Sequence, residues 1–421
     1  MAALSRFAYS LLWALGMPLV LGRLLWRARR QPEYLHQLGE RFARIEPTRQ
    51  PTIWLHAVSV GETRAAEPLV KALLAAYPEH RILLTHMTPT GRATGKSLFG
   101  KFERVQQSWL PYDLPWLARR FLRRVQPEAG IIMETEVWPN LMHAAQRLGV
   151  PMLLANARLS ARSARGYARL GGLSREAFAG FAQIAAQSEA DAQRLRAAGG
   201  RAVQVCGNIK YEVEIPAGTA ETAARFRSWC VQRPVLLAAS TRDGEEALLL
   251  DAFSQLAPPG VLLVLVPRHP QRFDEVATLA AQRGLVLARR SSAQPIGEQV
   301  RVWLGDSMGE MAAYYAMADV ALIGGSWLPF GSQNLIEACA AGVPVMIGPS
   351  SFNFAEAAEL AIAAGAARRC SDPLDGMRVA LSVLAQATLR AQMGAAGREF
   401  CARHSGATAR VLALLRPLMR G

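Results

Sequence analysis

Short apolar runs alternate with amphipathic, helix-length segments along most of this chain, and that alternation limits the folds open to it. In the first half the apolar runs TIWLHAV, RILLTHM, AGIIMET, VPMLLAN and QIAAQ begin at residues 52, 81, 129, 150 and 183. Helical patterns separate them, for example over 62–76 and 138–148. Strands that alternate with helices predict a parallel β-sheet with helices on both faces, which is an α/β fold.

The pattern starts again in the second half, where PVLLAAS, GVLLVLV, GLVLARR, ADVALIG and VPVMIG begin at residues 234, 260, 284, 318 and 343. A chain of 421 residues also exceeds the usual size of a single hydrophobic core. The segment YEVEIPAGTAET (211–222) contains Pro and Gly and is the expected linker. We therefore predict two doubly wound, Rossmann-like domains, 31–215 and 216–421, with ligands in a central cleft at the strand ends.

Composition excludes several classes of protein. Apolar residues make up 51% and charged residues 19%, which excludes a disordered or fibrous chain. Five cysteines without a C-x-x-C pair argue against a disulfide framework and a Cys-based zinc site, and they fit a reducing compartment. No G-x-G-x-x-G follows a first strand and no P-loop is present, which argues against a dinucleotide dehydrogenase.

Positive charge is concentrated in the first half. Up to Ile215 there are 29 Lys and Arg against 16 Asp and Glu, whereas beyond it there are 19 against 17. This asymmetry indicates that the first domain faces an anionic surface or substrate. A nucleic-acid-binding protein is one alternative, but the arginines are dispersed, aromatic residues are only 7%, and no helix-turn-helix or RNA-binding signature is present.

Residues 1–30 form the expected membrane-anchor segment. Sixteen uncharged residues lie between Arg6 and Arg23, and three more arginines follow by residue 30. A full span needs about 20 apolar residues, and the positive-inside rule keeps the arginines cytoplasmic. We expect a protein on the cytoplasmic face of a membrane, whose anchor helix either spans the bilayer or lies in its interface. A cleaved signal peptide and a helix buried on the protein are the alternatives.

Glu62 lies after the strand TIWL and the turn HAVSVG, near the start of a helix. The helix dipole favours a carboxylate there and keeps it ionised, as a general base must be. A glutamate that merely complements the dipole is the alternative interpretation.

Further polar residues are expected at the same sheet edge. Glu134 and Glu136 end the strand IIM and would project from one face of it, on the ligand-facing edge. A solvated loop, or ion pairs with Arg158 or Arg162, would also explain them. Lys210 lies in GNIKYE just before the linker, and a lysine there suits a phosphate or a carboxylate.

Three strand–turn–helix units of the second half offer polar groups at one expected sheet edge. The first carries PRH directly after a buried strand, the second carries MGE at a helix start, and the third is the Gly-rich loop 324–332. We expect the backbone N–H groups of Ser332 to Asn334 to bind a phosphate at that helix start. Asn334 and Glu337 share a helical face, where the carboxylate would accept ribose hydroxyls. A capped helix with a buried polar pair is the alternative interpretation for any one of these three units.

The motifs HAVSVGE, MTPTG, LPYDLP, METEVWPNL, NARLSARS, VPRHPQRF, GDSMGEM and NLIE occur in this order. The chain thereby resembles the 3-deoxy-D-manno-oct-2-ulosonic acid (Kdo) transferases of lipopolysaccharide core synthesis, over nearly its whole length. The resemblance implies a GT-B glycosyltransferase at the cytoplasmic face of the inner membrane. It implies CMP-Kdo as donor, the lipid A precursor lipid IVA as acceptor, inversion at the anomeric carbon, and no metal or other cofactor.

The resemblance also assigns roles to residues. Glu62 would be the general base, and Glu134 and Lys210 would stabilise the transition state. The residues implied to bind the CMP moiety are Pro267, Arg268, Met308, Gly309, Glu310, Asn334, Leu335, Ile336 and Glu337. The resemblance implies histidine in many relatives where this chain has Gln333 and Ser351, and neither of these side chains can carry the positive charge of a protonated histidine.

Two other functions remain open at this point. Another nucleotide-sugar enzyme of the same fold, such as a UDP-sugar transferase or epimerase, would bind UDP in preference to CMP. A non-catalytic membrane scaffold would leave the carboxylates at the strand ends unexplained.

Overall fold

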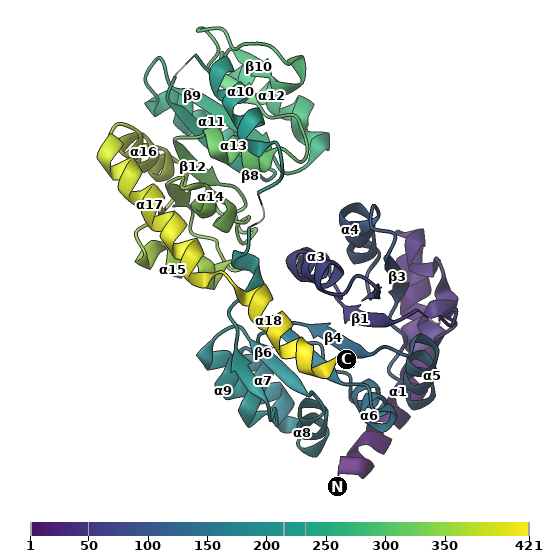
Figure 1. Cartoon of the computed structure of the whole chain (residues 1–421). Coiled ribbons are helices and arrows are strands. Elements are labelled where there is room, and N and C mark those ends of the chain that lie inside the picture. Colours follow the sequence, from purple (N-terminus) through teal and green to yellow (C-terminus); the bar gives the residue numbers. More distant parts are fainter. Residues whose placement is uncertain (1, 49, 214, 232, 420–421) are drawn as a thin grey trace. The chain divides into compact units, whose positions relative to one another are not determined.

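The computed structural model of this chain describes residues 2–48, 50–213, 215–231 and 233–419 (Figure 1). Glu214, in the expected linker, lies outside the described residues. The chain divides into two compact units, each with its own sheet and core. Unit 1 is Met1–Glu212 with Ser405–Gly421, and unit 2 is Val213–His404.

Within the described ranges, unit 1 has a seven-stranded parallel sheet in the order β3-β2-β1-β4-β5-β6-β7. Its strands are β1 (Thr52–His56), β2 (Arg81–His86), β3 (Val105–Trp109), β4 (Ala129–Met133), β5 (Met152–Ala157), β6 (Gln183–Ala186) and β7 (Val203–Val205). Leu55 pairs with Leu84 of β2 on one side and with Ile131 of β4 on the other. The strand order therefore reverses between β1 and β4, and this is the switch point at which doubly wound sheets bind ligands.

Helices cover both faces of the unit 1 sheet (Figure 1). They are α1 (Ala2–Ala28), α2 (Val60–Ala65), α3 (Glu67–Ala76), α4 (Pro89–Phe99), α5 (Pro115–Val125), α6 (Pro139–Leu148), α7 (Ala161–Arg169), α8 (Gly172–Ala179), α9 (Glu189–Ala197) and α18 (Ala407–Leu415). Ile53 and Leu55 point into one core and Trp54 into the other, and all three are fully buried. Because alternate residues of a strand face opposite sides, strands buried on both faces are apolar throughout.

The last helix corrects the domain boundaries predicted from the sequence. Residues 405–421 were expected in the second domain, but α18 packs on α3, β5 and β6 of unit 1. Val411 and Leu415 are fully buried in that core, the Thr408 N–H donates to Glu212, and Arg410 Nε donates to the Cys206 carbonyl at 2.7 Å. An amphipathic C-terminal helix fits either domain by pattern, and only packing decides which.

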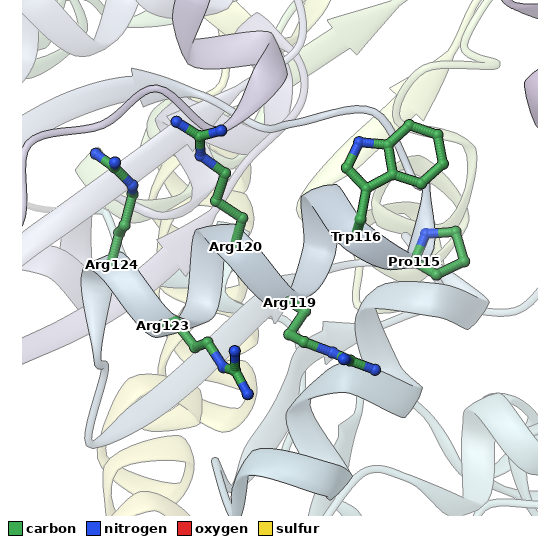
Figure 2. A pocket seen from close by; sticks show the side chains of 6 residues that line it. All are labelled: Pro115, Trp116, Arg119, Arg120, Arg123 and Arg124. Atoms are coloured by element: carbon green, nitrogen blue, oxygen red, sulfur yellow. The ribbon is translucent and has the colours of Figure 1, made fainter.

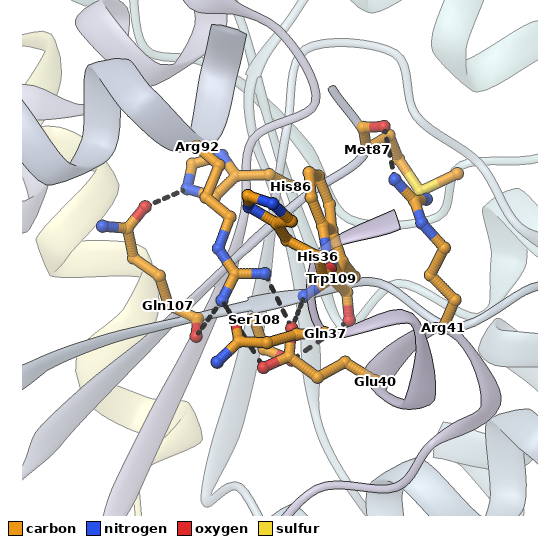
Figure 3. A network of polar contacts seen from close by, with 10 residues as sticks. All are labelled: His36, Gln37, Glu40, Arg41, His86, Met87, Arg92, Gln107, Ser108 and Trp109. Carbon is orange, nitrogen blue, oxygen red and sulfur yellow. Dashed lines mark hydrogen bonds and ion pairs between the residues drawn. The ribbon is translucent and has the colours of Figure 1, made fainter. Parts of the chain in front are cut away.

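A polar network fixes the segment that joins α1 to the sheet (Figure 3). Glu40 lies in the short helix η2 (Leu38–Phe42) and accepts hydrogen bonds from Arg92 at 2.8 Å and from the Trp109 N–H at 2.9 Å. The Arg41 guanidinium stacks 4.1 Å from the Trp109 ring centroid and is itself buried. These contacts bind the connecting segment to α4 and β3.

Unit 2 repeats the architecture, with a seven-stranded parallel sheet in the order β10-β11-β9-β8-β12-β13-β14 within the described ranges. Its strands are β8 (Val235–Thr241), β9 (Leu262–Pro267), β10 (Leu287–Arg289), β11 (Val302–Leu304), β12 (Val320–Ile323), β13 (Val345–Ile347) and β14 (Ala367–Arg369). Its helices are α10 (Thr219–Trp229), α11 (Glu245–Leu256), α12 (Phe273–Gln282), α13 (Met311–Met317), α14 (Ile336–Ala341), α15 (Ala355–Ala363), α16 (Pro373–Leu384) and α17 (Ala387–His404). Here the strand order reverses between β8 and β12.

β11 is the strand expected before the MGE turn, and three other strands had no counterpart among the predicted strands: β3, β7 and β14. All three are edge strands. Their sequences, VQQSW, VQV and ARR, are polar, and several of their residues are exposed. An edge strand pairs on one side only and is less covered, so it lacks the continuous apolar run of a central strand.

We expect Leu415→Ala to destabilise unit 1 by about 2–5 kcal/mol, because it removes a fully buried side chain and leaves a cavity. Urea unfolding followed by circular dichroism measures this loss. Ala413→Ser, at an exposed position of the same helix, is the matched control. Equal stability of the two variants would contradict the packing of α18 on unit 1.

Candidate functional site

Glu62 lies at the switch point of unit 1, in the first turn of α2 directly after β1. Its carboxylate accepts a hydrogen bond from the Val58 N–H at 2.6 Å and another from the Ser59 hydroxyl at 3.2 Å. Ser59 caps the helix and accepts from the Glu62 N–H in return. The alternative interpretation, in which this glutamate only complements the start of the helix, is therefore partly correct, because Glu62 and Ser59 form a reciprocal capping pair.

The electrostatic environment of Glu62 goes beyond capping. Burial, together with the charges of Glu134 and Glu136, raises the pKa of Glu62 to about 7 against the lowering effect of the Val58 and Ser59 hydrogen bonds. A carboxylate with a pKa near neutral exchanges its proton at physiological pH, as a general base requires. Two nearby carboxylates are the type of neighbour that produces such a shift.

Glu134 and Lys210 meet at the same sheet edge. β4 ends at Met133, and Glu134 has a left-handed backbone with φ of 57°, a conformation that non-glycine residues rarely adopt. Its side chain forms an ion pair with Lys210 at 3.0 Å. The sequence predicted that Glu134 and Glu136 project from one face of the strand, but the strand ends before both of them. The ion-pair partner of Glu134 is Lys210 rather than Arg158 or Arg162.

Asn156 supports Lys210 and was not among the predicted site residues. It is fully buried in β5 and has φ of 53°, at an irregularity in the pairing of β5 with β6. Its side-chain oxygen accepts the Ile209 N–H at 3.1 Å, next to Lys210, and its carbonyl accepts from Gln187 at 2.9 Å. A polar residue inside the apolar run VPMLLAN was the available sequence signal.

In unit 2 the Gly-rich loop after β12 is held by the fully buried carboxylate of Glu245. Glu245 accepts the backbone N–H groups of Arg242, Gly325, Trp327 and Leu328 at 2.6–3.3 Å. Burial raises its pKa, and these four hydrogen bonds oppose the shift. The interaction fixes the loop against the end of β8.

The expected phosphate site on this loop needs correction. The Ser332 N–H donates to the Gly325 carbonyl at 2.6 Å and the Gln333 N–H to the Gly324 carbonyl at 2.8 Å. Both groups are therefore used to close the loop, at a left-handed Ser332 with φ of 71°. Of the three N–H groups predicted to bind phosphate, two already have intramolecular partners.

The predicted donor residues around α14 divide into two kinds. Asn334 lies just before α14 and so does not share a helical face with Glu337, but its Nδ2 donates to Glu337 at 2.9 Å, and both side chains are half-buried. Leu335 and Ile336 are buried in the core, so their side chains serve packing. Of the two positions where the resemblance implied histidine in many relatives, Gln333 is half-buried and Ser351 accepts hydrogen bonds from Arg369 at 3.2 Å.

The turn before α13 carries the other predicted donor residues. Met308 is exposed, and Gly309 has φ of 83°, which suits glycine. Glu310 forms an ion pair with Arg290 at 2.7 Å. This ion pair holds the turn and occupies one oxygen of the carboxylate.

Several positively charged side chains lie where β8 and β9 end. Pro267 is the last residue of β9, and Arg268 follows it with its N–H bonded to the Thr241 carbonyl. The guanidinium groups of Arg242, Arg268 and Arg272 lie near the His269 ring. Burial lowers the pKa of His269, and these three positive charges lower it further. Arg242, which stacks on Phe330 at 4.7 Å, was not predicted from the sequence.

Among the described residues, no group of three or more His, Cys, Asp and Glu side chains is placed to hold a metal ion.

Comparison with known proteins identifies the family of this chain. A family model described as 3-deoxy-D-manno-octulosonic-acid transferase (kdotransferase) matches residues 36–213. A 3-deoxy-D-manno-octulosonic acid transferase of Bordetella pertussis is 48% identical over 89% of both chains. One of Haemophilus influenzae is 36% identical over 98% of this chain and 99% of its own.

Solved structures with much lower identity share the fold. A UDP-GlcNAc 2-epimerase of Neisseria meningitidis, bound to UDP-GlcNAc, is 13% identical, with a TM-score of 0.59 over 87% of this chain and all of its own. Alr3699/HepE of Anabaena, in complex with UDP, is 16% identical, with a TM-score of 0.56 over 87% of this chain and 99% of its own. The predicted fold class, GT-B with two doubly wound domains and an N-terminal apolar helix, is confirmed. With two curated relatives matched over most of their length, the chain belongs to the 3-deoxy-D-manno-octulosonic acid (Kdo) transferase family.

Proposed function

We propose that this Kdo transferase moves Kdo from CMP-Kdo to the lipid A precursor lipid IVA, with inversion at the anomeric carbon, on the cytoplasmic face of the inner membrane. The observation that carries the proposal is the carboxylate of Glu62, desolvated at the switch point of unit 1 with its pKa raised to about 7. The family and the basic charge of the first 215 residues support a phosphorylated acceptor.

Glu62 is the proposed general base. It accepts a proton from the acceptor hydroxyl as that oxygen attacks the anomeric carbon on the face opposite the leaving CMP. A pKa close to the working pH serves this step, because the group is ionised before the reaction and basic enough to hold the proton. Val58 and Ser59 orient the carboxylate through its two hydrogen bonds.

Glu134 and Lys210 are proposed to stabilise the transition state as a pair. Departure of CMP leaves an oxocarbenium-like sugar whose positive charge Glu134 can face. Lys210 holds Glu134 through their ion pair and can also meet the carboxylate of the sugar. Asn156 is a positioning residue, because it holds the backbone next to Lys210.

The donor is proposed to bind unit 2. Arg268 and Arg242 would stabilise the phosphate as it gains charge, and Asn334 and Glu337 would hydrogen-bond the ribose. These side chains take over the role first expected of the Ser332 and Gln333 N–H groups. The step as proposed uses no metal or other cofactor.

We expect Glu62→Gln to fold normally and to lower turnover of CMP-Kdo and lipid IVA by about 10²–10⁴-fold, because the amide cannot accept the proton. Product mass measures the transfer and counts the sugars added. Glu67→Gln, in the next helix, is the matched control because Glu67 pairs with Lys71 on the surface of α3. Near-wild-type transfer by the Glu62 variant would remove this residue from the mechanism.

The rate should also depend on pH. Since the base must be ionised, turnover should rise with pH through about 7, and the Glu67→Gln variant should keep this profile. A rate that stays constant from pH 5.5 to 8.5 would contradict the assignment.

Stability should change with pH in the opposite sense. A pKa raised from 4.5 to about 7 means that the folded protein loses stability as pH rises through this window, because a buried carboxyl is forced to ionise. We therefore expect Glu62→Gln to melt at a higher temperature than the unchanged protein at pH 8.5 and at the same temperature near pH 4.5. A variant that melts lower at pH 8.5 would show that the ionised group is instead stabilising.

Nucleotide specificity separates this function from that of a UDP-sugar enzyme. CMP at 100 times its dissociation constant should stabilise the protein by about 2.7 kcal/mol, whereas UDP at the same concentration should not. Thermal unfolding measures both, and Glu337→Ala should reduce the CMP effect. A larger shift with UDP would favour the alternative enzyme class.

A further inference from the structure

Helix α1 presents a long apolar face to solvent. Ser5–Ala28 is long and apolar enough to cross a membrane by length and composition, yet only 6% of its most apolar stretch is buried against the protein. Leu19 is 80% exposed and Leu12 is 71% exposed. The large side chains on this face include Phe7, Leu11, Leu12, Leu15, Leu19 and Trp26. At 100° per residue they cluster on one side of the helix, along about 28 Å.

The opposite face of α1 is fastened to unit 1 by polar contacts at its beginning. Arg6 forms an ion pair with Glu176 of α8. The Tyr9 hydroxyl donates to the buried carboxylate of Asp113 at 2.9 Å. Asp113 also accepts the N–H groups of Asn140 and Leu141 at the start of α6, so one carboxylate joins the two helices.

Apolar packing continues this attachment to the end of the helix. Trp13, Met17, Val20 and Leu21 pack on the core cluster that contains Leu117 and Phe121 of α5. Leu24 and Ala28 are buried, and the network around Glu40 and Trp109 then fixes the following segment (Figure 3). The helix is therefore held along its length, and its two faces are distinct.

This attachment is incompatible with a bilayer span. A spanning helix is surrounded by hydrocarbon about 30 Å thick, in which unpaired polar groups are costly. If α1 spanned while docked, Asp113, Asn140 and Glu176 would lie at the depth of the lipid chains. If it undocked, Asp113 would lose the Tyr9 hydrogen bond and the core cluster would lose its cover. A helix that stays docked can only lie along the membrane surface.

Charge indicates which surface covers the apolar face. Arg23, Arg27, Arg29 and Arg30 are exposed at the end of α1. On α5, Arg119, Arg120, Arg123 and Arg124 line a shallow pocket of about 500 Å³ together with Trp116, which is 60% exposed (Figure 2). An apolar helix face followed by exposed arginines, with further arginines and an exposed tryptophan on α5 of the same unit, fits an anionic lipid surface, in which tryptophan occupies the headgroup level.

We infer that α1 lies flat in the headgroup region of an anionic lipid bilayer while it remains docked on unit 1, with the arginine face of α5 as a second, electrostatic contact. The inference stands independently of the sugar donor and acceptor proposed above, because it concerns only where the protein rests. It selects the interfacial option of the two that the sequence left open.

Flotation of the full-length protein with vesicles tests the surface. We expect binding to phosphatidylcholine vesicles that contain 30% phosphatidylglycerol, and weaker binding without the anionic lipid. Leu19→Glu should abolish binding with no loss of thermal stability, because the side chain is exposed. Leu170→Glu, at a 53% exposed leucine outside α1, is the matched control and should bind as before. Replacing Arg119 and Arg123 with Gln should weaken binding roughly fivefold per arginine.

Depth measurement distinguishes lying from spanning. Spin labels at Leu11→Cys, Leu15→Cys and Leu19→Cys should report the same shallow depth, and the unmodified chain serves as the blank because its five cysteines are buried. Depths that change by about 6 Å from one position to the next would show a span and overturn the inference. A dimer that Leu19→Glu dissociates, with no vesicle binding, would assign the apolar face to a second copy instead and would also overturn it.

Discussion

The constraint on which this structure depends is that the paired strands of each sheet are parallel. Parallel strands end at one edge of their sheet, so the loops that follow them must meet there. In unit 1 that edge gathers Glu62, Glu134 and Lys210 from three distant parts of the chain, and in unit 2 it gathers the Gly-rich loop and the arginines after β8 and β9. The strand order reverses once in each sheet, beside β1 and beside β8, and the polar groups concentrate at these two places.

Buried carboxylates serve different purposes according to how many donors they meet. Glu245 accepts four backbone N–H groups and Asp113 accepts two together with a tyrosine hydroxyl, so both hold neighbouring backbone in place. Glu62 accepts only two hydrogen bonds and faces two other carboxylates, which leaves its proton affinity high. Burial raises the pKa of all three carboxyl groups, so what distinguishes Glu62 is the pair of neighbouring carboxylates together with its fewer donors, and residue type alone reveals neither.

Much of the fold was predictable because central strands and helices carry local patterns. The runs TIWLHAV and PVLLAAS begin strands buried on both faces, and such strands must be apolar at every position. The edge strands β3, β7 and β14 were not predicted, because partial exposure permits polar residues in them. At the candidate site, Glu62, Glu134 and Lys210 could be proposed from the sequence because each follows a strand in a recognisable motif, and the structure brings them to one sheet edge. Asn156 and Arg242 were missed because their roles depend on contacts with residues far along the chain.

By itself, the sequence determined the α/β class, the two units and the family, since periodicity and ordered motifs are properties of the linear chain. Tertiary structure decided that α18 completes unit 1, that the Ser332 and Gln333 N–H groups close a loop, and that α1 has one docked and one open face. The physical reason is the same in each case. The apolar face of a helix can pack on any suitable apolar surface, and an N–H group can donate to any suitable acceptor. Only folding in three dimensions determines which partner is within reach.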